Sequence, residues 1–190
     1  MHLDKSQTLL NLAKSFAGEA QAGLRYQFTA DKALQEGYKI LSDEIRKIAK
    51  NEVNHAKVFF ELITDNVGNR DNIEFTAGYP FEGTTLEEGL NFAVKEEKAE
   101  VDIYQNYAKI ADEEGFTEIA NKFRLISAVE EHHADIFKYL HTGYVKNKLY
   151  RNKTPLMWVC SECGHMETLR EGWQECPLCS STKGFIEIKL

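Results

Sequence analysis

The chain lacks several features that would point to common classes of protein. It has no cysteine in its first 159 residues, and all 4 cysteines lie between positions 160 and 179. A disulfide framework usually joins distant segments, so this clustering indicates a metal site instead. Proline is also scarce, with 3 residues in 190, and none interrupts residues 6–36.

The sequence has neither an excess of positive charge nor a long apolar run. Its formal net charge is -7, whereas a surface that binds nucleic-acid phosphates needs a basic excess, so nucleic acid is not the expected partner. No segment is apolar for long enough to cross a bilayer, and the start MHLDKSQTLLNLAKSF does not read as a signal peptide. We therefore expect a cytoplasmic protein with no membrane partner, whose acidic residues are available for cations.

What is present is a helical pattern over most of the chain. Apolar residues recur every three or four positions, which predicts amphipathic helices over about 6–36, 40–63, 85–114 and 117–141. Thr85 and Glu88 predict a capping box at the start of the third helix. Residues 65–84 are rich in glycine and asparagine and predict a connection long enough for the second and third helices to run parallel.

The two halves of this helical region repeat with an offset of 78 residues. The matching positions include the rarer residue types and are Glu19/Glu97, Tyr26/Tyr104, Ala30/Ala108, Glu36/Glu114, Gly37/Gly115, Ile48/Ile126, Glu52/Glu130, His55/His133 and Phe59/Phe137. Such agreement predicts a duplicated helical hairpin, and therefore a mainly α four-helix bundle with a pseudo-twofold axis.

A Glu-x-x-His motif lies in each half of the repeat. Within each motif the glutamate and the histidine share one helix face, and a further glutamate precedes the motif by 33 residues. The six residues are Glu19, Glu52, His55, Glu97, Glu130 and His133. A single motif of this kind is more commonly a solvated face or a core histidine. Here apolar neighbours predict that the glutamates are buried, which two divalent cations would make favourable.

Glu100 is the main departure from the repeat. Its counterpart is Ala22, and it lies one turn after Glu97 on the same helix face, so we expect it to offer an extra carboxylate to the metals. Carboxylates with imidazole suit iron or manganese. Tyr26 and Tyr104 are predicted either to donate hydrogen bonds to ligand carboxylates or simply to fill the core.

The cysteines form two C-x-x-C pairs in a short C-terminal segment. The four predicted thiolate ligands are Cys160, Cys163, Cys176 and Cys179. A tetrahedral set of this kind fits either zinc or a single iron. The predicted organisation is a bundle at 1–142, a linker at 143–155 and a metal domain at 156–190, which is too short to build a core without such a staple.

At this point the sequence resembles the rubrerythrin family. The strings FAGEAQAGLRY, YAKIADEEGF, WVCSECG and CPLC, together with the twin Glu-x-x-His motifs, carry the resemblance over nearly the whole chain. It implies a ferritin-like diiron bundle followed by a rubredoxin-like domain, in a homodimer that brings one subunit's rubredoxin-like domain near the other's diiron site. It further implies a peroxidase that reduces hydrogen peroxide to water in oxidative-stress defence. Electrons would come from NAD(P)H through a separate reductase or rubredoxin.

The resemblance also implies roles for the site residues. Two non-haem iron ions would be bridged by Glu52 and Glu130, and one further iron would lie in the four-cysteine site. The terminal ligands would be Glu19 and His55 on one iron, and Glu97 and His133 on the other. On oxidation, the iron nearer His55 would exchange that imidazole for Glu100.

Two positions depart from the usual family pattern. The spacing to Tyr104 leaves Glu96 as a rival of Glu97 for the first ligand of the third helix, and the repeat favours Glu97. Ser180 stands where a glycine commonly follows the second cysteine pair, which weakens the assignment of iron there. The alternative functions are an iron-binding or ferroxidase protein and a dioxygen-reducing diiron oxidase, and the four-cysteine segment could instead be a zinc ribbon used for docking.

Overall fold

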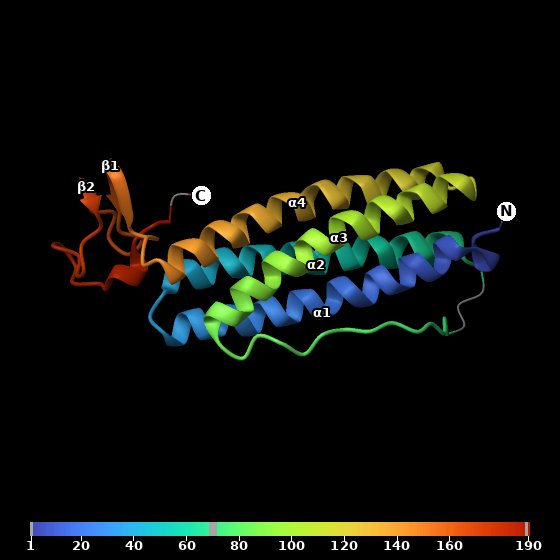
Figure 1. Cartoon of the computed structure of the whole chain (residues 1–190), viewed down its shortest axis with the longest axis horizontal. Coiled ribbons are helices and arrows are strands. Elements are labelled where there is room, and N and C mark those ends of the chain that lie inside the picture. Colours follow the sequence, from blue (N-terminus) through green and yellow to red (C-terminus); the bar gives the residue numbers. More distant parts are fainter. Residues whose placement is uncertain (1, 69–71, 189) are drawn as a thin grey trace.

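The computed structural model describes residues 2–68, 72–188 and 190, and consists of a long helical bundle with a small strand-containing unit at one end (Figure 1). The helices are α1 (Gln7–Gln35), α2 (Lys39–Asn66), α3 (Leu86–Glu113) and α4 (Thr117–Val145), with a short 3-10 helix η1 (Leu3–Lys5) before them. The predicted mainly α four-helix bundle is confirmed. The predicted helix ends were too early for α2 and α4, which continue to Asn66 and Val145.

The starts of α1 and α3 are set by side-chain caps. The Ser6 hydroxyl accepts the backbone N–H of Leu9 at 3.1 Å. The capping box predicted for Thr85 and Glu88 is present in both directions. These contacts satisfy backbone donors that the first turn of a helix cannot satisfy itself.

The sequence repeat is visible in the two helix turns. Gly37 and Gly115 end the first helix of each hairpin with φ angles of +86° and +88°, a conformation that favours glycine. After each glycine, the next residue donates its N–H to a helix carbonyl five residues earlier, at 2.8 Å for Tyr38 and 2.7 Å for Phe116. The two hairpins therefore close with the same backbone geometry.

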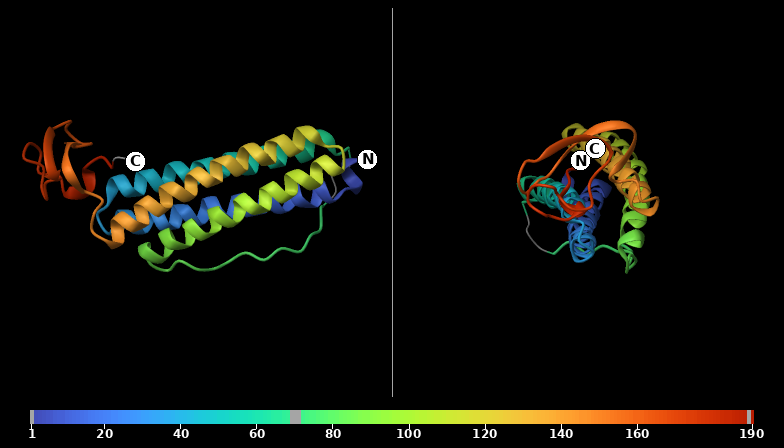
Figure 2. Two further views of the ribbon diagram at one scale, coloured as in Figure 1. Left: turned by 45° about the horizontal axis from the view of Figure 1, so that its top comes forward. Right: turned by 90° about the vertical axis from the view of Figure 1, so that its left-hand side faces the viewer.

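The connection between α2 and α3 returns along the whole bundle, so these two helices run parallel as predicted (Figures 1 and 2). Part of the predicted connection, residues 69–71, lies outside the described residues. Two contacts fix its course along α1. The Tyr79 hydroxyl donates to the carbonyl of Lys14 at 3.2 Å, and the Lys32 ammonium donates to the carbonyl of Gly83 at 2.7 Å.

The bundle core is divided into two apolar clusters along its length. One contains Leu12, Phe59, Ala108 and Phe123, and the other contains Ala30, Leu41, Leu90 and Phe137. The glutamates of the predicted metal site lie between these clusters along each helix, so they are enclosed from both ends of the bundle. Among the described residues, no helix is long and apolar enough to cross a membrane.

The C-terminal unit is a two-stranded antiparallel sheet followed by loops and a short helix. It comprises β1 (Arg151–Val159), β2 (Met166–Glu171) and a 3-10 helix η2 (Lys183–Phe185). The predicted linker at 143–155 is largely structured, because α4 reaches Val145 and β1 begins at Arg151. The physical reason is close packing at Gly143, where an added Cβ would lie 2.6 Å from the side chain of Leu149. The division into two domains stays a prediction.

The C-terminal unit packs against the end of the bundle near the turn between α1 and α2. Tyr150, Trp158 and Ile186 belong to the same buried cluster as Leu41 of α2. The backbones meet most closely at Gly184, where an added Cβ would lie 1.7 Å from the carbonyl oxygen of Gly37. Only glycine therefore fits at position 184 in this arrangement.

We predict that Gly184→Ala weakens this packing. Because the obstacle is backbone rather than a flexible side chain, the unit must shift, which typically costs about 1–3 kcal/mol. Cleavage by a protease at residues 146–150 should become faster than in the unsubstituted chain. Gly78→Ala is the control for a general effect of replacing glycine, since nothing lies within 4 Å of its added Cβ and its φ angle is not in the left-handed region. Equal cleavage rates for Gly184→Ala and the unsubstituted chain would contradict the packing.

Candidate metal centres

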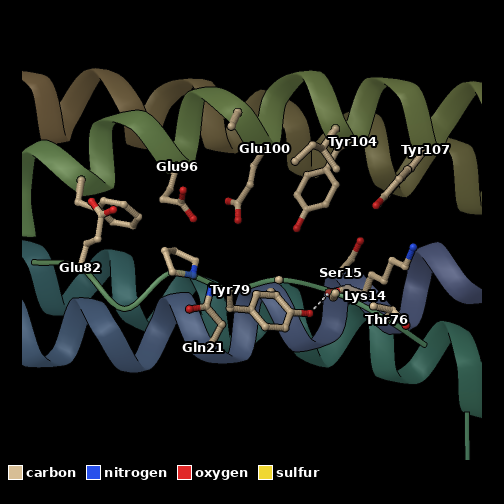
Figure 3. A pocket seen from close by; sticks show the side chains of 17 residues that line it. Lys14, Ser15, Gln21, Thr76, Tyr79, Glu82, Glu96, Glu100, Tyr104 and Tyr107 are labelled. Atoms are coloured by element: carbon tan, nitrogen blue, oxygen red, sulfur yellow. Dashed lines mark hydrogen bonds between the residues drawn. The ribbon is translucent and has the colours of Figure 1, made fainter. Parts of the chain in front are cut away.

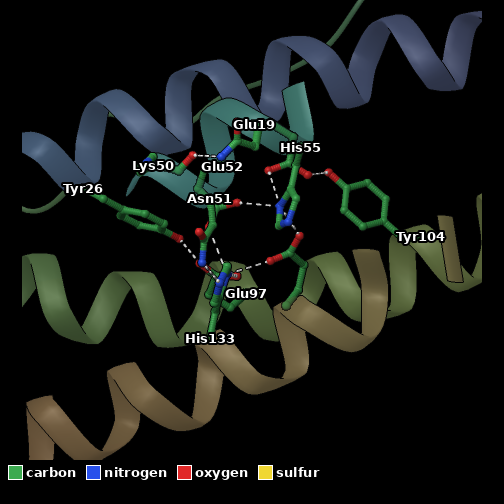
Figure 4. A network of polar contacts seen from close by, with 11 residues as sticks. Glu19, Tyr26, Lys50, Asn51, Glu52, His55, Glu97, Tyr104 and His133 are labelled. Carbon is green, nitrogen blue, oxygen red and sulfur yellow. Dashed lines mark hydrogen bonds and ion pairs between the residues drawn. The ribbon is translucent and has the colours of Figure 1, made fainter. Parts of the chain in front are cut away.

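The six residues predicted from the repeat converge in the middle of the bundle (Figure 4). They form two overlapping groups whose ligand atoms lie within 4.8 Å of one another. The groups are Glu19, Glu52, His55 and Glu130, and Glu52, Glu97, Glu130 and His133. Each helix contributes at least one glutamate, and all four glutamates are 0% exposed. We call the part with Glu19 and His55 the His55 half, and the part with Glu97 and His133 the His133 half.

The distances give Glu52 and Glu130 a shared position between the two halves. His133 Nδ1 lies 2.9 Å from a carboxylate oxygen of each, while His55 Nδ1 lies 3.2 Å from Glu52 and 3.0 Å from Glu130. The other two glutamates are each next to one histidine. Glu19 lies 3.7 Å from His55 Nδ1, and Glu97 lies 3.7 Å from His133 Nδ1. This is the arrangement of two bridging and two terminal carboxylates.

Two tyrosines join the halves across the bundle. Tyr26 of α1 donates a hydrogen bond to Glu97 of α3, and Tyr104 of α3 donates one to Glu19 of α1 (Figure 4). Of the two roles that the sequence allowed, the structure therefore has the hydrogen-bonding one. Each bond leaves the second oxygen of its carboxylate directed toward the centre without a hydrogen bond.

The donor set fits a pair of metal ions. Five buried carboxylate oxygens from the four glutamates, together with His133 Nδ1, make no directed hydrogen bond within the described chain. Buried polar atoms are normally satisfied, because an unsatisfied one costs free energy. Their convergence on one small volume is explained if cations occupy it, and oxygen donors with imidazole suit iron.

Charge and burial shift the pKa values of the metal-free site strongly. Burial lowers the pKa of both histidines, but the surrounding carboxylates outweigh it and raise the pKa to about 12 for His55 and about 11 for His133. Burial raises the pKa of Glu97 to about 8, and it also raises the pKa of Glu19 well above its usual value. For Glu52 burial acts upward, yet the two histidines bring its pKa to about 2. Without metal, protons therefore take part of the role of the cations.

Asn51 is a contact that the sequence analysis missed. Its side-chain amide lies 3.2 Å from His133 Nε2, the ring nitrogen that faces away from the carboxylates. A partner on this nitrogen fixes the orientation of the imidazole. The repeat position of Asn51 is Val129, which has no polar side chain to offer His55. The mismatch of Asn51 with Val129 in the repeat was the signal in the sequence that could have pointed to this contact.

Glu96 and Glu100 lie outside the two ligand groups. Glu96 pairs with Arg25 at 3.4 Å and is half-buried, whereas Glu97 is fully buried within the cluster. The carboxylate of Glu100 is directed between α3 and α1 and has one buried oxygen without a hydrogen bond (Figure 3). Burial, and then the charge of Glu19, raises the pKa of Glu100 well above its usual value. Glu100 therefore lies close enough for the charge of Glu19 to affect its pKa, although it is outside both ligand groups.

A chamber of about 620 Å³ opens beside the His55 half (Figure 3). Its walls are α1, α3 and the connection before α3. Glu100 and Tyr104 lie on its inner wall, and Tyr104 is the residue that contacts Glu19. This space was not predictable from the sequence, because it depends on the course of the connection around Tyr79.

The four cysteines also converge, as predicted. Their sulfur atoms lie within 4.8 Å of one another, with 3.8 Å between Cys160 and Cys179 and 3.6 Å between Cys163 and Cys176. A tetrahedron of thiolates about 2.3 Å from a metal has edges of roughly 3.8 Å. All four cysteines are free of disulfides. The site therefore fits one tetrahedral ion without rearrangement.

The Ser181 hydroxyl lies between two of these sulfurs, 3.2 Å from Cys160 and 3.2 Å from Cys179. Burial raises the pKa of Cys160, but this hydroxyl and nearby backbone amides outweigh it and bring the pKa to about 6. Its neighbour Ser180 has a φ angle of +61°, close to the +73° of Gly164 after the first pair. Serine thus adopts the conformation for which glycine is usual at this position.

Comparison with known proteins places this geometry in a family. The rubrerythrin family model matches residues 11–85 and 88–156. The chain belongs to the rubrerythrin family. It is 35% identical over 188 residues to a rubrerythrin of Clostridium perfringens, covering 98% of this chain and 96% of the relative. It is 33% identical over 184 residues to a rubrerythrin of Porphyromonas gingivalis, covering 96% and 90%.

Solved structures agree on the fold. A nigerythrin structure has a TM-score of 0.63 at 21% identity and covers 97% of this chain and 90% of its own. A bacterioferritin of Desulfovibrio desulfuricans has a TM-score of 0.67 at 21% identity and covers 75% and 82%. The ferritin-like bundle is thereby confirmed. As a member of this family, the chain is a diiron oxidoreductase, with a carboxylate and histidine site for two non-haem iron ions in the bundle and a four-cysteine site that fits one further metal ion, iron or zinc.

The pKa values predict proton release when the bundle site is loaded. At pH 7 the metal-free site keeps protons on His55, His133 and Glu97, because their pKa values are about 12, 11 and 8. A metal ion displaces these protons, so its apparent affinity should rise from about pH 6 to about pH 8. Manganese(II) is a suitable probe because it prefers these ligands to thiolates. A pH indicator in weak buffer measures the release, and a pH-independent affinity would contradict the shifts.

The position of Ser181 predicts an effect on the four-cysteine iron. A hydrogen bond to a thiolate stabilises the more negative, reduced centre, so Ser181→Ala should lower its reduction potential. A tenfold change in the equilibrium constant corresponds to about 59 mV for this one-electron couple. Spectroelectrochemistry of the iron–thiolate absorption measures it. The matched control is Ser161→Ala, because the Ser161 hydroxyl donates to the carbonyl of Phe185 at 2.8 Å. Equal potentials for Ser181→Ala and Ser161→Ala would contradict a role of the hydroxyl.

Proposed function

We propose that this rubrerythrin is a peroxidase that reduces hydrogen peroxide to water in defence against oxidative stress. The observation that carries the proposal is the cluster of buried carboxylates and histidines with a chamber open to one side of it. Iron bound in the cluster would supply the two electrons that break the oxygen–oxygen bond. The proposed ligands are Glu19, Glu52, His55, Glu97, Glu130 and His133.

The residues of the chain would act mainly by fixing this site. Glu52 and Glu130 would bridge the ions, which agrees with their short distances to both histidines. Tyr26 and Tyr104 would hold Glu97 and Glu19 in place through their hydrogen bonds. The apolar clusters at both ends would limit the access of water to the bridged pair.

The His55 half is the proposed site of change during the reaction. Asn51 holds His133, whereas the equivalent position opposite His55 is a valine. The side chain of His55 is 12% exposed and that of His133 is 2% exposed. His55 would therefore be the freer of the two histidine ligands, and Glu100 would offer a nearby carboxylate in its place when the irons are oxidised.

Electron delivery is the proposed role of the four-cysteine iron. The C-terminal unit lies at the end of the bundle where α2 begins at Lys39 (Figure 1). Glu52 lies about 20 Å further along this helix. Transfer within one chain would have to cross this distance, so we propose a homodimer that brings one subunit's unit near the other's cluster. The reductant would be NAD(P)H, acting through a separate reductase or rubredoxin.

An iron-storage or ferroxidase role would use the same cluster, and the likeness to bacterioferritin extends to the fold alone. A dioxygen-reducing oxidase with a zinc-ribbon tail is the other rival. The four-cysteine unit favours the peroxidase, because a one-electron carrier fused to the bundle serves repeated turnover with an external reductant. The test is to mix the reduced, iron-loaded chain with hydrogen peroxide under anaerobic conditions. Rapid consumption of the peroxide, with two electrons used per molecule, would support the proposal.

Glu100→Ala tests whether the carboxylate that is present beside only one half of the repeat takes part in turnover. The variant should keep its iron but reduce hydrogen peroxide about 10- to 100-fold more slowly, as is usual when a group that supports a metal ligand is lost. Iron content by elemental analysis and peroxide consumption by stopped flow give the two readouts. Glu96→Ala is the matched control, because Glu96 also lines the chamber but pairs with Arg25. If Glu100→Ala turned over peroxide as fast as Glu96→Ala, the role proposed for Glu100 would be wrong.

A further inference from the structure

The chamber beside the His55 half is much larger than hydrogen peroxide requires. It has a volume of about 620 Å³, whereas a small molecule the size of water occupies roughly 30 Å³ in the liquid. Pockets of several hundred cubic ångströms are typical of sites for organic ligands. The chamber therefore has room for an organic molecule as well as for hydrogen peroxide.

The walls of the chamber differ between its inner and outer parts. Glu100 and Tyr104 provide oxygen atoms on the inner wall, next to the cluster. Phe92, Ile103 and Tyr79 supply aromatic and aliphatic surface to the rest of the wall, which also contains polar side chains. A ligand with a polar end and an apolar body would match both parts, because its polar end reaches the oxygens while its body displaces water from the apolar wall.

The charged side chains of the chamber are of both signs. Glu96 is paired with Arg25 at 3.4 Å, and Lys14 adds a positive charge to the wall. Glu82 lies at the outer part of the connection and is exposed. Glu82 and Glu100 are the other carboxylates of the lining, so the wall carries charges of both signs and favours neither an anion nor a cation over a neutral ligand.

We propose that the chamber admits organic hydroperoxides, ROOH, as substrates of the same diiron site. The hydrocarbon group R would lie against Phe92, Ile103 and Tyr79, with the peroxy group directed past Glu100 toward the His55 half. The oxygen–oxygen bond breaks, and ROOH takes up two electrons and two protons to give ROH and water. The electrons come from the external reductant through the four-cysteine iron, so the inference rests on the proposed peroxidase function.

The connection before α3 makes the chamber a lasting feature of the fold. Tyr79 spans from this connection to α1, where its hydroxyl donates to the carbonyl of Lys14 at 3.2 Å. The Lys32 ammonium fixes a second point at Gly83. With these contacts the connection lies along α1 and forms a wall of the chamber opposite α3 (Figure 3).

The experiment compares two peroxides with a variant that fills the chamber. The full iron-loaded chain is assayed for kcat/KM with hydrogen peroxide and with cumene hydroperoxide, and both should be reduced. Ala99 is an exposed alanine on the α3 wall. Ala99→Trp should lower kcat/KM for cumene hydroperoxide at least tenfold and change that for hydrogen peroxide less than twofold. The matched control is Ala128→Trp, since Ala128 is an exposed alanine of α4 outside the chamber lining.

A binding measurement separates the chamber from the chemistry. Cumyl alcohol, the product of cumene hydroperoxide, is titrated into the metal-free chain and followed by NMR. It should shift resonances of Phe92 and Ile103 in the unsubstituted chain and in Ala128→Trp, and not in Ala99→Trp. This readout does not depend on iron or on turnover.

The outcomes are distinguishable from failure of the peroxidase function itself. Reduction of hydrogen peroxide without any reduction of cumene hydroperoxide would overturn the inference and leave the proposed function intact. Equal losses for both peroxides in Ala99→Trp would also overturn it, because the substitution would then act on the site as a whole. If neither peroxide were reduced, the proposed function would fail. Absence of cumyl alcohol binding would then overturn the chamber as an organic site as well.

Discussion

The structure depends on the burial of four glutamates in the middle of a helical bundle. Each is 0% exposed, and together with two histidines they converge on one small volume. Carboxylates are tolerated there only if cations or protons offset their charge. The apolar clusters on either side, the tyrosine hydrogen bonds and the shared positions of Glu52 and Glu130 all follow from that requirement.

Much of the fold and of the cluster was predictable, because the duplication supplied a register. A glutamate on a helix is ambiguous by itself, but the constant offset distinguished Glu97 from Glu96, and the structure has Glu97 in the cluster. The ends of the helices were less predictable. The fourth helix was predicted to end at about residue 141, yet α4 continues through Gly143 to Val145, and Leu149 packs against Gly143. Local propensity cannot reveal a contact that the following segment makes.

Contacts that break the repeat were the hardest to foresee. Asn51 of α2 contacts a histidine on another helix, His133 of α4. The chamber depends on Tyr79 and Lys32, which hold the connection beside α1. The packing of the C-terminal unit similarly rests on two glycine backbones that are far apart in sequence, Gly37 and Gly184. These features arise from tertiary geometry, whereas periodicity reports only which face of a helix is buried.

The course of the connection between α2 and α3 has a consequence for the history of the site. A duplicated hairpin begins with two equivalent halves, yet this segment passes along one side of the bundle and so forms a chamber beside the His55 half. A substitution that changes what enters the chamber would therefore act on one copy, while in the other copy His133 is buried and contacts Asn51. The connection between α2 and α3 thus allows the two halves of the repeat to diverge while the duplicated hairpins keep the same backbone geometry.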